Sequence, residues 1–386
     1  MAPMNAMNPT HAATNPPATT PGLPAGVERR VELSFDSAAV ANETHTNLSA
    51  VRQDGRCLWV AGDETATIER LTAVHDAAGR VTAYAGHRTV RLADLVDLPG
   101  GPDDEADIEG LARAGGWLWA VGSHSLKRRR IRPHHSAAKA RRRLATVVRE
   151  PNRFILVRVP VVTGPDGLPE ARREAVVDGE RRTAAVLGAH GDALTGLLAD
   201  DPHLAPFLAL PGKDNGFDVE GIAALGDRLF IGLRGPVLRG WAVLLEIRPR
   251  THPRDDGRLA LRPFPDGSRY RTHFLDLDGL GIRDLCPHGD DLLILAGPSM
   301  DLDGPVRVLR WPGAAAVDQP AIVPAERLRV LLEPPYGAGD DHAEGIALLR
   351  EPPDPVERLL IVYDSPAPSR QGPAGSVYAD VVPLPR

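Results

Sequence analysis

The chain has 386 residues, of which 42% are hydrophobic and 25% charged, and its formal net charge is −6. This composition is that of an ordinary globular protein and excludes a chain that is disordered throughout. No stretch approaches the roughly 18 uncharged apolar residues of a membrane span. Two cysteines, Cys57 and Cys286, are too few for a disulfide scaffold. We therefore expect a protein of a reducing compartment, the cytoplasm.

The first 28 residues are predicted to form a disordered tail. They are rich in Pro, Thr, Ala and Asn, and they lack the charged start and the apolar stretch of a secretory signal. The whole chain contains 38 Gly and 37 Pro, which indicates many tight turns between short strands. We expect residues 29–386 to form a single all-β domain.

Five segments resemble one another, with a period near sixty residues. Three contain Glu-Gly-[Leu/Ile]-Ala, and four share a polar turn with Gly followed by an apolar run, which is the pattern of a β-hairpin. A further apolar run follows, so each unit has three or four strands. Units of about four antiparallel strands repeated around a ring form a β-propeller. The segments are 47–64, 107–124, 218–235, 281–298 and 342–364.

The repeat favours a propeller of five blades, with six as the alternative. The segments start 60, 111, 63 and 61 residues apart, so one gap is too long. A basic insertion at 127–143 and a helical insertion at 190–210 account for the excess, and a degenerate sixth unit is the competing explanation. The alternating segments 30–35 and 376–384 could share a blade and close the ring. An open β-sandwich of hairpins is the alternative fold.

The repeat gathers carboxylates on one face of the predicted ring, near its axis. The first strand of each blade starts at the rim to which the second strand returns, so Asp63 and Asp364 join the same face. Ca²⁺ accepts about six to eight oxygen ligands in loose geometry, whereas Zn²⁺ would need more His or Cys. Alternatively, each Glu before Gly is a clasp to the neighbouring blade. The predicted metal ligands are Asp107, Glu109, Asp218, Glu220, Asp284 and Glu344.

Polar and cationic residues at this rim are predicted to bind a small anionic ligand. The fourth unit has Arg283 where other units have Glu, and the first unit has Ser49. Arg283 could hold a phosphate or carboxylate bidentately, or it could pair with Glu220 or Glu344. The candidate substrate-binding residues are Arg234, Arg283, His342 and Ser123.

Metal-assisted hydrolysis of a small anionic ester or phosphoester is the reaction that this rim could perform. A cation-bound water would attack, and His124 is the tentative catalytic proton carrier. The sequence lacks the Gly-x-Ser-x-Gly motif, a Walker loop, a dinucleotide-binding glycine pattern and Cys/His zinc spacing. A non-catalytic propeller that binds a protein or a polyanion is the alternative function.

The basic insertion at 127–143 contains nine Lys or Arg residues and no acidic residue. Such asymmetry is typical of a surface that meets a polyanion, here nucleic acid or anionic lipid. The insertion leaves the second blade beside the proposed rim, so it could also guide anionic substrates there. A solvated helical excursion is the alternative interpretation.

Four strings resemble those of an uncharacterised bacterial family that contains a domain of unknown function. The Asp-x-Glu-Gly-[Leu/Ile] elements are also similar to those of phytase-like and esterase-like β-propellers. That second likeness implies calcium-dependent or hydrolytic chemistry at the channel mouth, carried by Asp107, Glu109, Asp218, Glu220 and Glu344, whereas Arg283 and Ser49 depart from the pattern. The four strings are GSHSLKR (122–128), GLRGPVLRGW (232–241), LILAGPSMDLDGP (293–305) and VYDSP (362–366).

Overall fold

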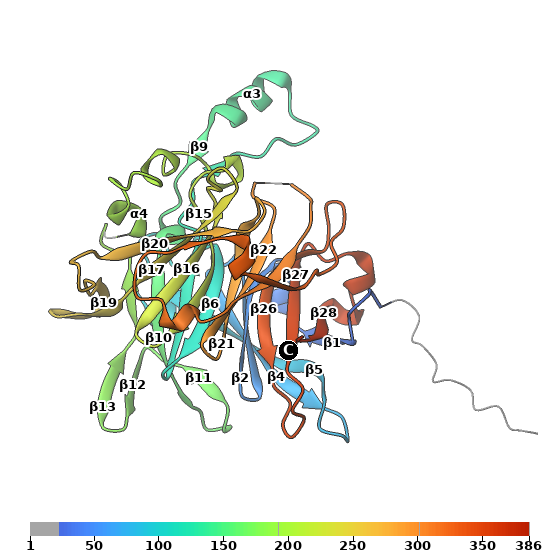
Figure 1. Ribbon diagram of the computed structural model, residues 1–386. Coiled ribbons are helices and arrows are strands. Elements are labelled where there is room, and N and C mark those ends of the chain that lie inside the picture. Colours follow the sequence, from blue (N-terminus) through green and yellow to red (C-terminus); the bar gives the residue numbers. More distant parts are fainter. Residues whose placement is uncertain (1–22, 192, 301, 386) are drawn as a thin grey trace, which may run out of the picture.

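Five antiparallel β-hairpins form the centre of the computed structural model, which describes residues 23–191, 193–300 and 302–385 (Figure 1). Each predicted repeat segment contains one of these hairpins. Glycines at positive φ, such as Gly55 and Gly289, allow the tight turns between the paired strands. The pairs are β2 (Leu48–Asp54) with β3 (Cys57–Gly62), β6 (Ile108–Ala114) with β7 (Trp117–Gly122), β15 (Asp218–Leu225) with β16 (Arg228–Gly235), β21 (Gly281–His288) with β22 (Asp291–Gly297), and β26 (His342–Leu349) with β27 (Arg358–Asp364).

The first strands of the five hairpins contact one another in a closed circle. Strand β2 packs against β6, β6 against β15, β15 against β21, β21 against β26, and β26 against β2. An open sandwich has two facing sheets rather than such a circle. The all-β fold is therefore propeller-like, with the starts of the inner strands at one end of the ring and their turns at the other.

Outer strands extend each hairpin into a curled sheet. Two of these sheets merge, because β1 pairs with β28 on one side and with β5 on the other. The predicted pairing between segments 30–35 and 376–384 is thus confirmed. The outer strands are β1 (Arg29–Ser34), β4 (Thr67–His75), β5 (Val81–Arg91), β10 (Leu156–Thr163), β14 (Ala185–Leu187), β17 (Trp241–Ile247), β20 (Tyr270–Asp276), β23 (Arg307–Trp311), β25 (Arg329–Leu332) and β28 (Ser376–Pro383).

Shorter elements decorate these sheets. Strands β18 and β19 add to the edge of the sheet that contains β6, and β12 and β13 form a separate hairpin. Their bounds are β11 (Pro169–Ala171), β12 (Glu174–Val177), β13 (Glu180–Thr183), β18 (Pro249–His252), β19 (Asp255–Leu261), β24 (Ile322–Val323), α1 (Ser37–Ala41) and α2 (Leu92–Leu95).

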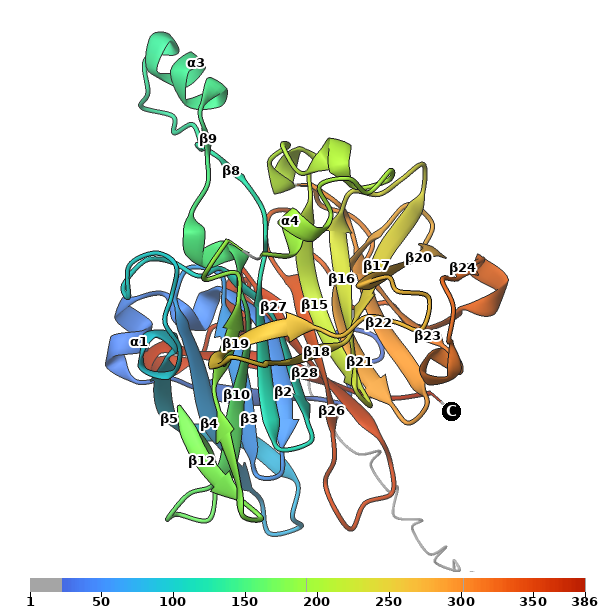
Figure 2. The ribbon, with the colours of Figure 1, turned by 90° about the vertical axis from the view of Figure 1, so that its left-hand side faces the viewer.

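The basic insertion is an arm that projects from the body of the molecule (Figures 1 and 2). Strands β8 (Lys127–Arg128) and β9 (Val147–Val148) pair at its base, and helix α3 (Ala137–Ala145) lies beyond them. The side chain of Ser136 caps the helix by accepting a hydrogen bond from the Lys139 backbone N–H.

The predicted helical insertion at 190–210 is mostly turns. It contains the four-residue helix α4 (Leu194–Leu197) and a 3-10 helix at Ala205–Phe207, while residue 192 lies outside the described residues. Pro202 and Pro206 cannot continue an α-helix, because proline lacks the backbone N–H and clashes with the preceding turn. The predicted disordered tail at 1–28 also lies outside the described residues up to residue 22.

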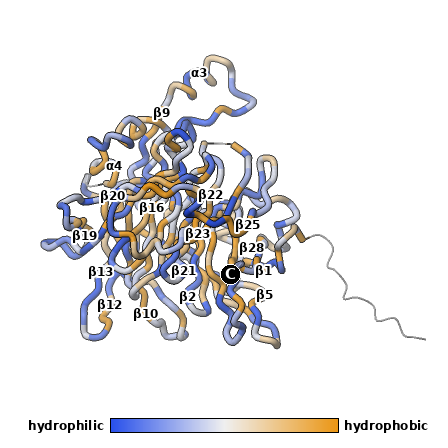
Figure 3. Tube along the Cα trace, in the orientation of Figure 1, coloured by the Kyte–Doolittle hydropathy of each residue, from blue (hydrophilic) through white to orange (hydrophobic). Residues whose placement is uncertain are grey.

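The hydrophobic core lies between neighbouring sheets, and hydrophobic stretches run through the interior of the molecule (Figure 3). Strand β3 shows the principle, since Leu58 packs into one cluster and Trp59 into the next. Alternate residues of a strand point to opposite faces of the sheet, so each inner strand serves two interfaces. Within the described ranges, no helix has the length and apolar character needed to cross a membrane.

Candidate functional site

A β-bulge interrupts each of the five hairpins near the start of its first strand. A bulge leaves one residue without a partner in the ladder and re-aims its side chain. The bulged position is the one at which the repeat varies between Ser, Glu and Arg. The residues at the five bulges are Ser49, Glu109, Glu220, Arg283 and Glu344.

The glycine after each Glu of the repeat lets the next inner strand approach closely. A Cβ atom at Gly110 would lie 2.9 Å from a side-chain carbon of Ile222, and one at Gly221 would lie 2.6 Å from Cα of Asp284. Gly221 also has a φ of +84°, which disfavours any other residue. The Glu-Gly motif therefore combines a re-aimed carboxyl with a close contact between strands.

Three arginines pair with four carboxylates at this end of the ring. Arg153, in a 3-10 helix at Pro151–Phe154, forms an ion pair with Asp107. Arg234 donates from Nε to Asp218 over 3.0 Å, and its Nη1 lies 2.7 Å from Glu220. Arg283 bridges two neighbouring units, since its Nη1 lies 2.5 Å from Glu344 and 3.4 Å from Glu220. Arg283 thus makes both pairings that the sequence left open.

Glu109 differs from these carboxylates because it has no partner. Its exposure is 9%, and it makes no hydrogen bond or ion pair with any residue that the structure describes. Burial raises the pKa of Glu109 well above its ordinary value, and the negative charges of Asp107 and Glu220 raise it further. The carboxyl group therefore holds a proton more tightly than an exposed Glu does.

Asp63, which follows strand β3, is a second carboxyl without a partner. Its Oδ1 atom is buried and accepts no hydrogen bond from a described residue. Burial, followed by the charges of Asp107 and Asp364, raises the pKa of Asp63 to about 8. Asp63 is accordingly protonated at neutral pH.

Two of the paired carboxylates, Asp107 and Glu220, have pKa values raised toward neutrality. Burial raises the pKa of Asp107 to about 6 although Arg153 lowers it, and burial raises that of Glu220 to about 7 against the effects of Arg234 and Arg283. The charges of these groups raise the pKa values of others among them, so the groups lie close together. We call this set of carboxyl groups the axial acidic cluster. It comprises Asp63, Asp107, Glu109, Asp218, Glu220, Glu344 and Asp364.

Asp284, a predicted metal ligand, is instead bound by Arg52 inside the ring. Arg52 donates to both carboxylate oxygens, at 2.8 and 2.9 Å, and also to the carbonyl oxygens of Ile222 and Ile346. Asp284 accepts a further hydrogen bond, of 2.8 Å, from the backbone N–H of Ile346. Arg52 and Asp284 therefore join strands from four hairpins across the axis.

His124 lies near the rim but contacts none of the carboxylates. Its Nδ1 is 2.8 Å from the carbonyl oxygen of Gly122, and its ring meets the edge of Phe154. Burial lowers its pKa to about 4, so the ring is neutral. Its Nε2 is buried without a partner among the described residues. Ser123, in contrast, hydrogen-bonds to Asp107 and so belongs to the cluster's surroundings.

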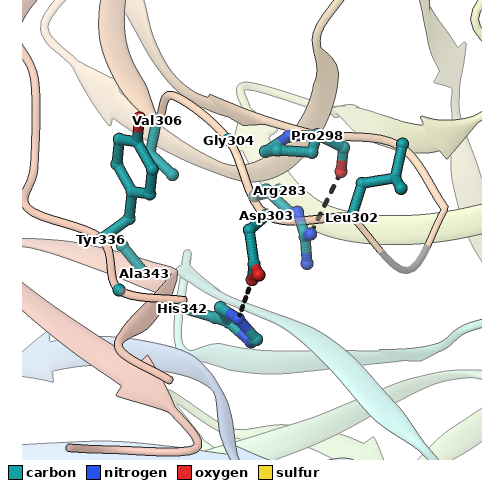
Figure 4. A pocket seen from close by; sticks show the side chains of 10 residues that line it. Arg283, Pro298, Leu302, Asp303, Gly304, Val306, Tyr336, His342 and Ala343 are labelled. Carbon is teal, nitrogen blue, oxygen red and sulfur yellow. Dashed lines mark hydrogen bonds and ion pairs between the residues drawn. The ribbon is translucent and has the colours of Figure 1, made fainter. Parts of the chain in front are cut away.

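His342 lines a small cavity together with Arg283 and Asp303 (Figure 4). Its Nε2 is 3.1 Å from Asp303, and the hydrogen bond that its ring donates to the Asp364 carboxylate is the first cause that raises its pKa. The cavity between Arg283 and His342 measures about 10 Å³, which is room for about one water molecule. An organic substrate would not fit there.

The donor atoms of the cluster are of the type that calcium prefers, but most of the predicted ligands are already paired with arginines. Four of the six predicted ligands are ion-paired with Arg153, Arg234 or Arg283, and a fifth is bound by Arg52. Across the described residues, no group of three or more His, Cys, Asp or Glu side chains is disposed to hold a metal. Calcium at this rim stays a prediction.

Sequence reasoning missed Arg52 and Arg153, which control the electrostatics of the ring. Each has a weak local signal, since Arg52 directly follows the apolar pair Ala50 and Val51, and Arg153 directly precedes the apolar run that begins at Phe154. Buried arginines are rare unless they are paired. Their partners, however, come from distant parts of the chain and could not be named without the fold.

The comparisons with known proteins identify the family. Residues 47–380 match a protein family described as "Protein of unknown function (DUF3616)", and the chain belongs to this family. The resemblance to a family with a domain of unknown function is thereby confirmed. Among curated proteins, none matches the chain significantly.

Two solved structures are similar over most of the chain. The glutaminyl cyclase of Myxococcus xanthus has 10% sequence identity and a TM-score of 0.38, with coverage of 93% of this chain and 97% of its own. The hydrazine synthase of Kuenenia stuttgartiensis has 10% identity and a TM-score of 0.31, with coverage of 89% and 67%.

Proposed function

We propose that the protein binds a small cation at the axial acidic cluster, in competition with protons. Glu109 carries this proposal, because it is a buried carboxyl group with no ion pair or hydrogen bond to a described residue. A buried carboxyl either keeps its proton or recruits a positive charge, since leaving it ionised and unpaired is costly.

The charge balance of the cluster supports the proposal. Its seven carboxyl groups are accompanied by three guanidinium groups, those of Arg153, Arg234 and Arg283. The carboxyl groups thus outnumber the guanidinium groups by four, and protons or bound cations must compensate the difference in charge. A divalent metal ion and the ammonium group of an amine share the chemistry that would satisfy this requirement.

Thermal unfolding with three cations at matched ionic strength tests the proposal and separates the two sources. CaCl₂, MgCl₂ and methylammonium chloride are each titrated at pH 8 and pH 5, with NaCl as the reference salt. We expect at least one cation to raise Tm saturably, and more strongly at pH 8, where fewer protons compete. If only CaCl₂ or MgCl₂ raises Tm, the bound cation is a metal ion. If only methylammonium chloride raises Tm, it is the ammonium group of an amine.

A matched pair of variants controls this experiment. Glu109→Gln removes the unpaired carboxyl and should abolish the shift, whereas Glu326→Gln alters an exposed carboxyl outside the cluster and should retain it. The proposal is wrong if all three cations behave as NaCl does, or if Glu109→Gln responds like the unaltered protein.

We also infer that the ring has five blades. The five inner strands close a circle of contacts without a sixth hairpin between β6 and β15 among the described residues, which supports five rather than six. A crystal structure with a sixth inner hairpin would contradict this inference. Hydrolysis of an anionic ester, with His124 as proton carrier, stays a prediction.

Binding of a polyanion by the arm is a second candidate function. Lys127 and Arg128 form ion pairs with Glu105 and Asp214 at the base of the arm. The other seven cationic side chains make no ion pair with described residues, and most of them are exposed. Unpaired cations on a projecting element are the features that favour contact with a polyanion.

Heparin affinity measured at increasing salt tests the arm. Replacement of Arg129, Arg130 and Arg132 by Gln should weaken heparin binding about tenfold or more at 100 mM NaCl, and it should flatten the salt dependence because fewer counterions are released. Gln at Arg269, Arg327 and Arg329, which lie outside the arm, is the charge-matched control. Equal losses in both triple variants would contradict a specific role of the arm.

A further inference from the structure

A cavity of about 710 Å³ lies at the end of the ring opposite the axial acidic cluster. Ligand pockets typically measure about 300 to 1,000 Å³, so this cavity can hold a small organic molecule. Its walls come from the far ends of the inner strands, including Ala112 of β6, Ala224 of β15, Cys286 of β21 and Ala347 of β26. The small side chains at these positions leave the space open.

The floor of this cavity is Arg52, the residue that clasps Asp284. Its two terminal nitrogens are occupied by Asp284 and backbone carbonyl oxygens. Its Nε atom, in contrast, is buried and has no hydrogen-bond partner among the described residues. Arg52 is 5% exposed, so the bottom of the cavity presents a deeply buried donor that is not satisfied.

The walls carry a surplus of positive charge. Arg113 pairs with Asp54 at 2.6 Å, and Glu351 pairs with Arg29 at 2.6 Å, so these charges are already balanced. Arg56 and Arg350 also line the cavity, yet neither forms an ion pair with a described residue.

Arg350 is anchored through its backbone to the side chain of Gln53 on β2. Its backbone N–H donates to the side chain of Gln53 over 2.8 Å, and its carbonyl oxygen accepts from the same side chain over 3.2 Å. Burial raises the pKa of the Cys286 thiol, whereas the charges of Arg52 and Arg350 act in the opposite direction. The Arg350 guanidinium therefore lies within electrostatic range of Cys286, which lines the cavity.

We propose that this cavity binds a small organic carboxylate, with its carboxylate group on Arg56 and Arg350 and its apolar part against Ala112, Ala224 and Ala347. A guanidinium group matches the geometry of a carboxylate and binds it through two parallel hydrogen bonds. The site shares no residue with the axial acidic cluster, so it stands or falls independently of the cation proposal.

Calorimetric titration of the full chain with succinate tests the proposal, with succinamide as the neutral analogue and inorganic phosphate as the competing oxyanion. All three are measured at the same ionic strength. We expect saturable binding of succinate and none of succinamide. Absence of succinate binding, or binding of phosphate alone, overturns the carboxylate assignment.

Three variants connect this binding to the cavity. The double change Arg56→Gln with Arg350→Gln should weaken succinate binding at least tenfold, and Ala224→Leu should weaken it by filling the space without altering charge. Arg269→Gln with Arg329→Gln removes two exposed arginines elsewhere and should leave binding unchanged. Thermal unfolding of each variant confirms that it is folded. Binding that survives the first double change refutes the proposal.

Discussion

The two ends of the ring are built from the same five inner strands, but they treat charge in opposite ways. At the starts of the strands, carboxylates crowd together, arginines are paired, and the cavity beside Arg283 holds about one water molecule. At the far ends, Arg56 and Arg350 form no ion pair with a described residue and line a cavity of about 710 Å³. The acidic end therefore suits the proposed binding of protons and small cations, and the opposite end suits the proposed binding of a small organic carboxylate.

The difference arises from backbone geometry over a short distance. Glu109 and Arg113 are four residues apart on β6, which is about 13 Å along a strand. Near Glu109, a bulge and the close contact at Gly110 bring neighbouring inner strands together. Near Arg113, the small side chains of Ala112 and Ala224 leave space between the strands for the cavity. Between the two ends, Arg52 and Asp284 form the barrier that keeps them apart.

We expect the largest loss of stability from a substitution in the ion pair of Arg52 and Asp284. Arg52→Met leaves Asp284 buried without its counter-ion, and we expect a loss of about 3 to 5 kcal/mol in the free energy of unfolding, measured with urea. Arg56→Met, at the exposed end, is the control and should cost less than about 0.5 kcal/mol. If the two variants are equally stable, Arg52 does not hold the ring together.

The next largest effect is expected from the paired arginines of the acidic end. Arg153→Gln removes the ion partner of Asp107, and we expect it to cost about 2 to 4 kcal/mol at pH 8. The pKa of Asp107 is about 6, so Asp107 is mostly protonated at pH 5 and the cost should be smaller there. Urea unfolding at both pH values checks this, and a cost that does not depend on pH would contradict it.

Glu109→Gln should stabilise the protein at high pH. The pKa of Glu109 is raised in the folded state, so folding keeps a proton that the unfolded chain releases, and stability falls as pH rises above about 4.5. Gln has no proton to lose. We expect equal stability at pH 5 and a gain of about 1 kcal/mol or more at pH 8, since one pKa unit corresponds to about 1.4 kcal/mol. A variant that is less stable than the unaltered protein at pH 8 would reverse our account of the acidic end.

Arg350→Gln should have the smallest effect. Arg350 is exposed and makes no ion pair with a described residue, so the free energy of unfolding should change by less than about 0.5 kcal/mol. A loss above about 1 kcal/mol would mean that Arg350 has a structural role, and the contrast between the two ends would then fail.

The hairpins and the meeting of the chain's ends could be predicted from sequence because they depend on local patterns. Polar turns with Gly55 or Gly289 between apolar runs specify hairpins, and the alternation in 30–35 marks a strand. The segment at 190–210 was misjudged because the helical spacing of its leucines outweighed Pro202 and Pro206 in our interpretation.

The gathering of carboxylates could be predicted, but their pairing could not. Register in the repeat placed Glu109, Glu220 and Glu344 on one face, since bulged positions recur with the hairpins. Which of them would remain without a partner depends on where the long side chains of Arg153 and Arg234 reach. Tertiary packing determines where these side chains end, and no repeating pattern in the sequence indicates it.

The shared sheet of β1 and β28 ties the first described strand to the last. Arg29 lies opposite Val381, so this contact spans almost the whole chain. Pairings of such long sequence separation form late, because the cost of closing a large loop comes before any gain. During synthesis, β1 and β27 therefore each lack one strand partner until β28 has been made, and until then their unpaired edges are exposed.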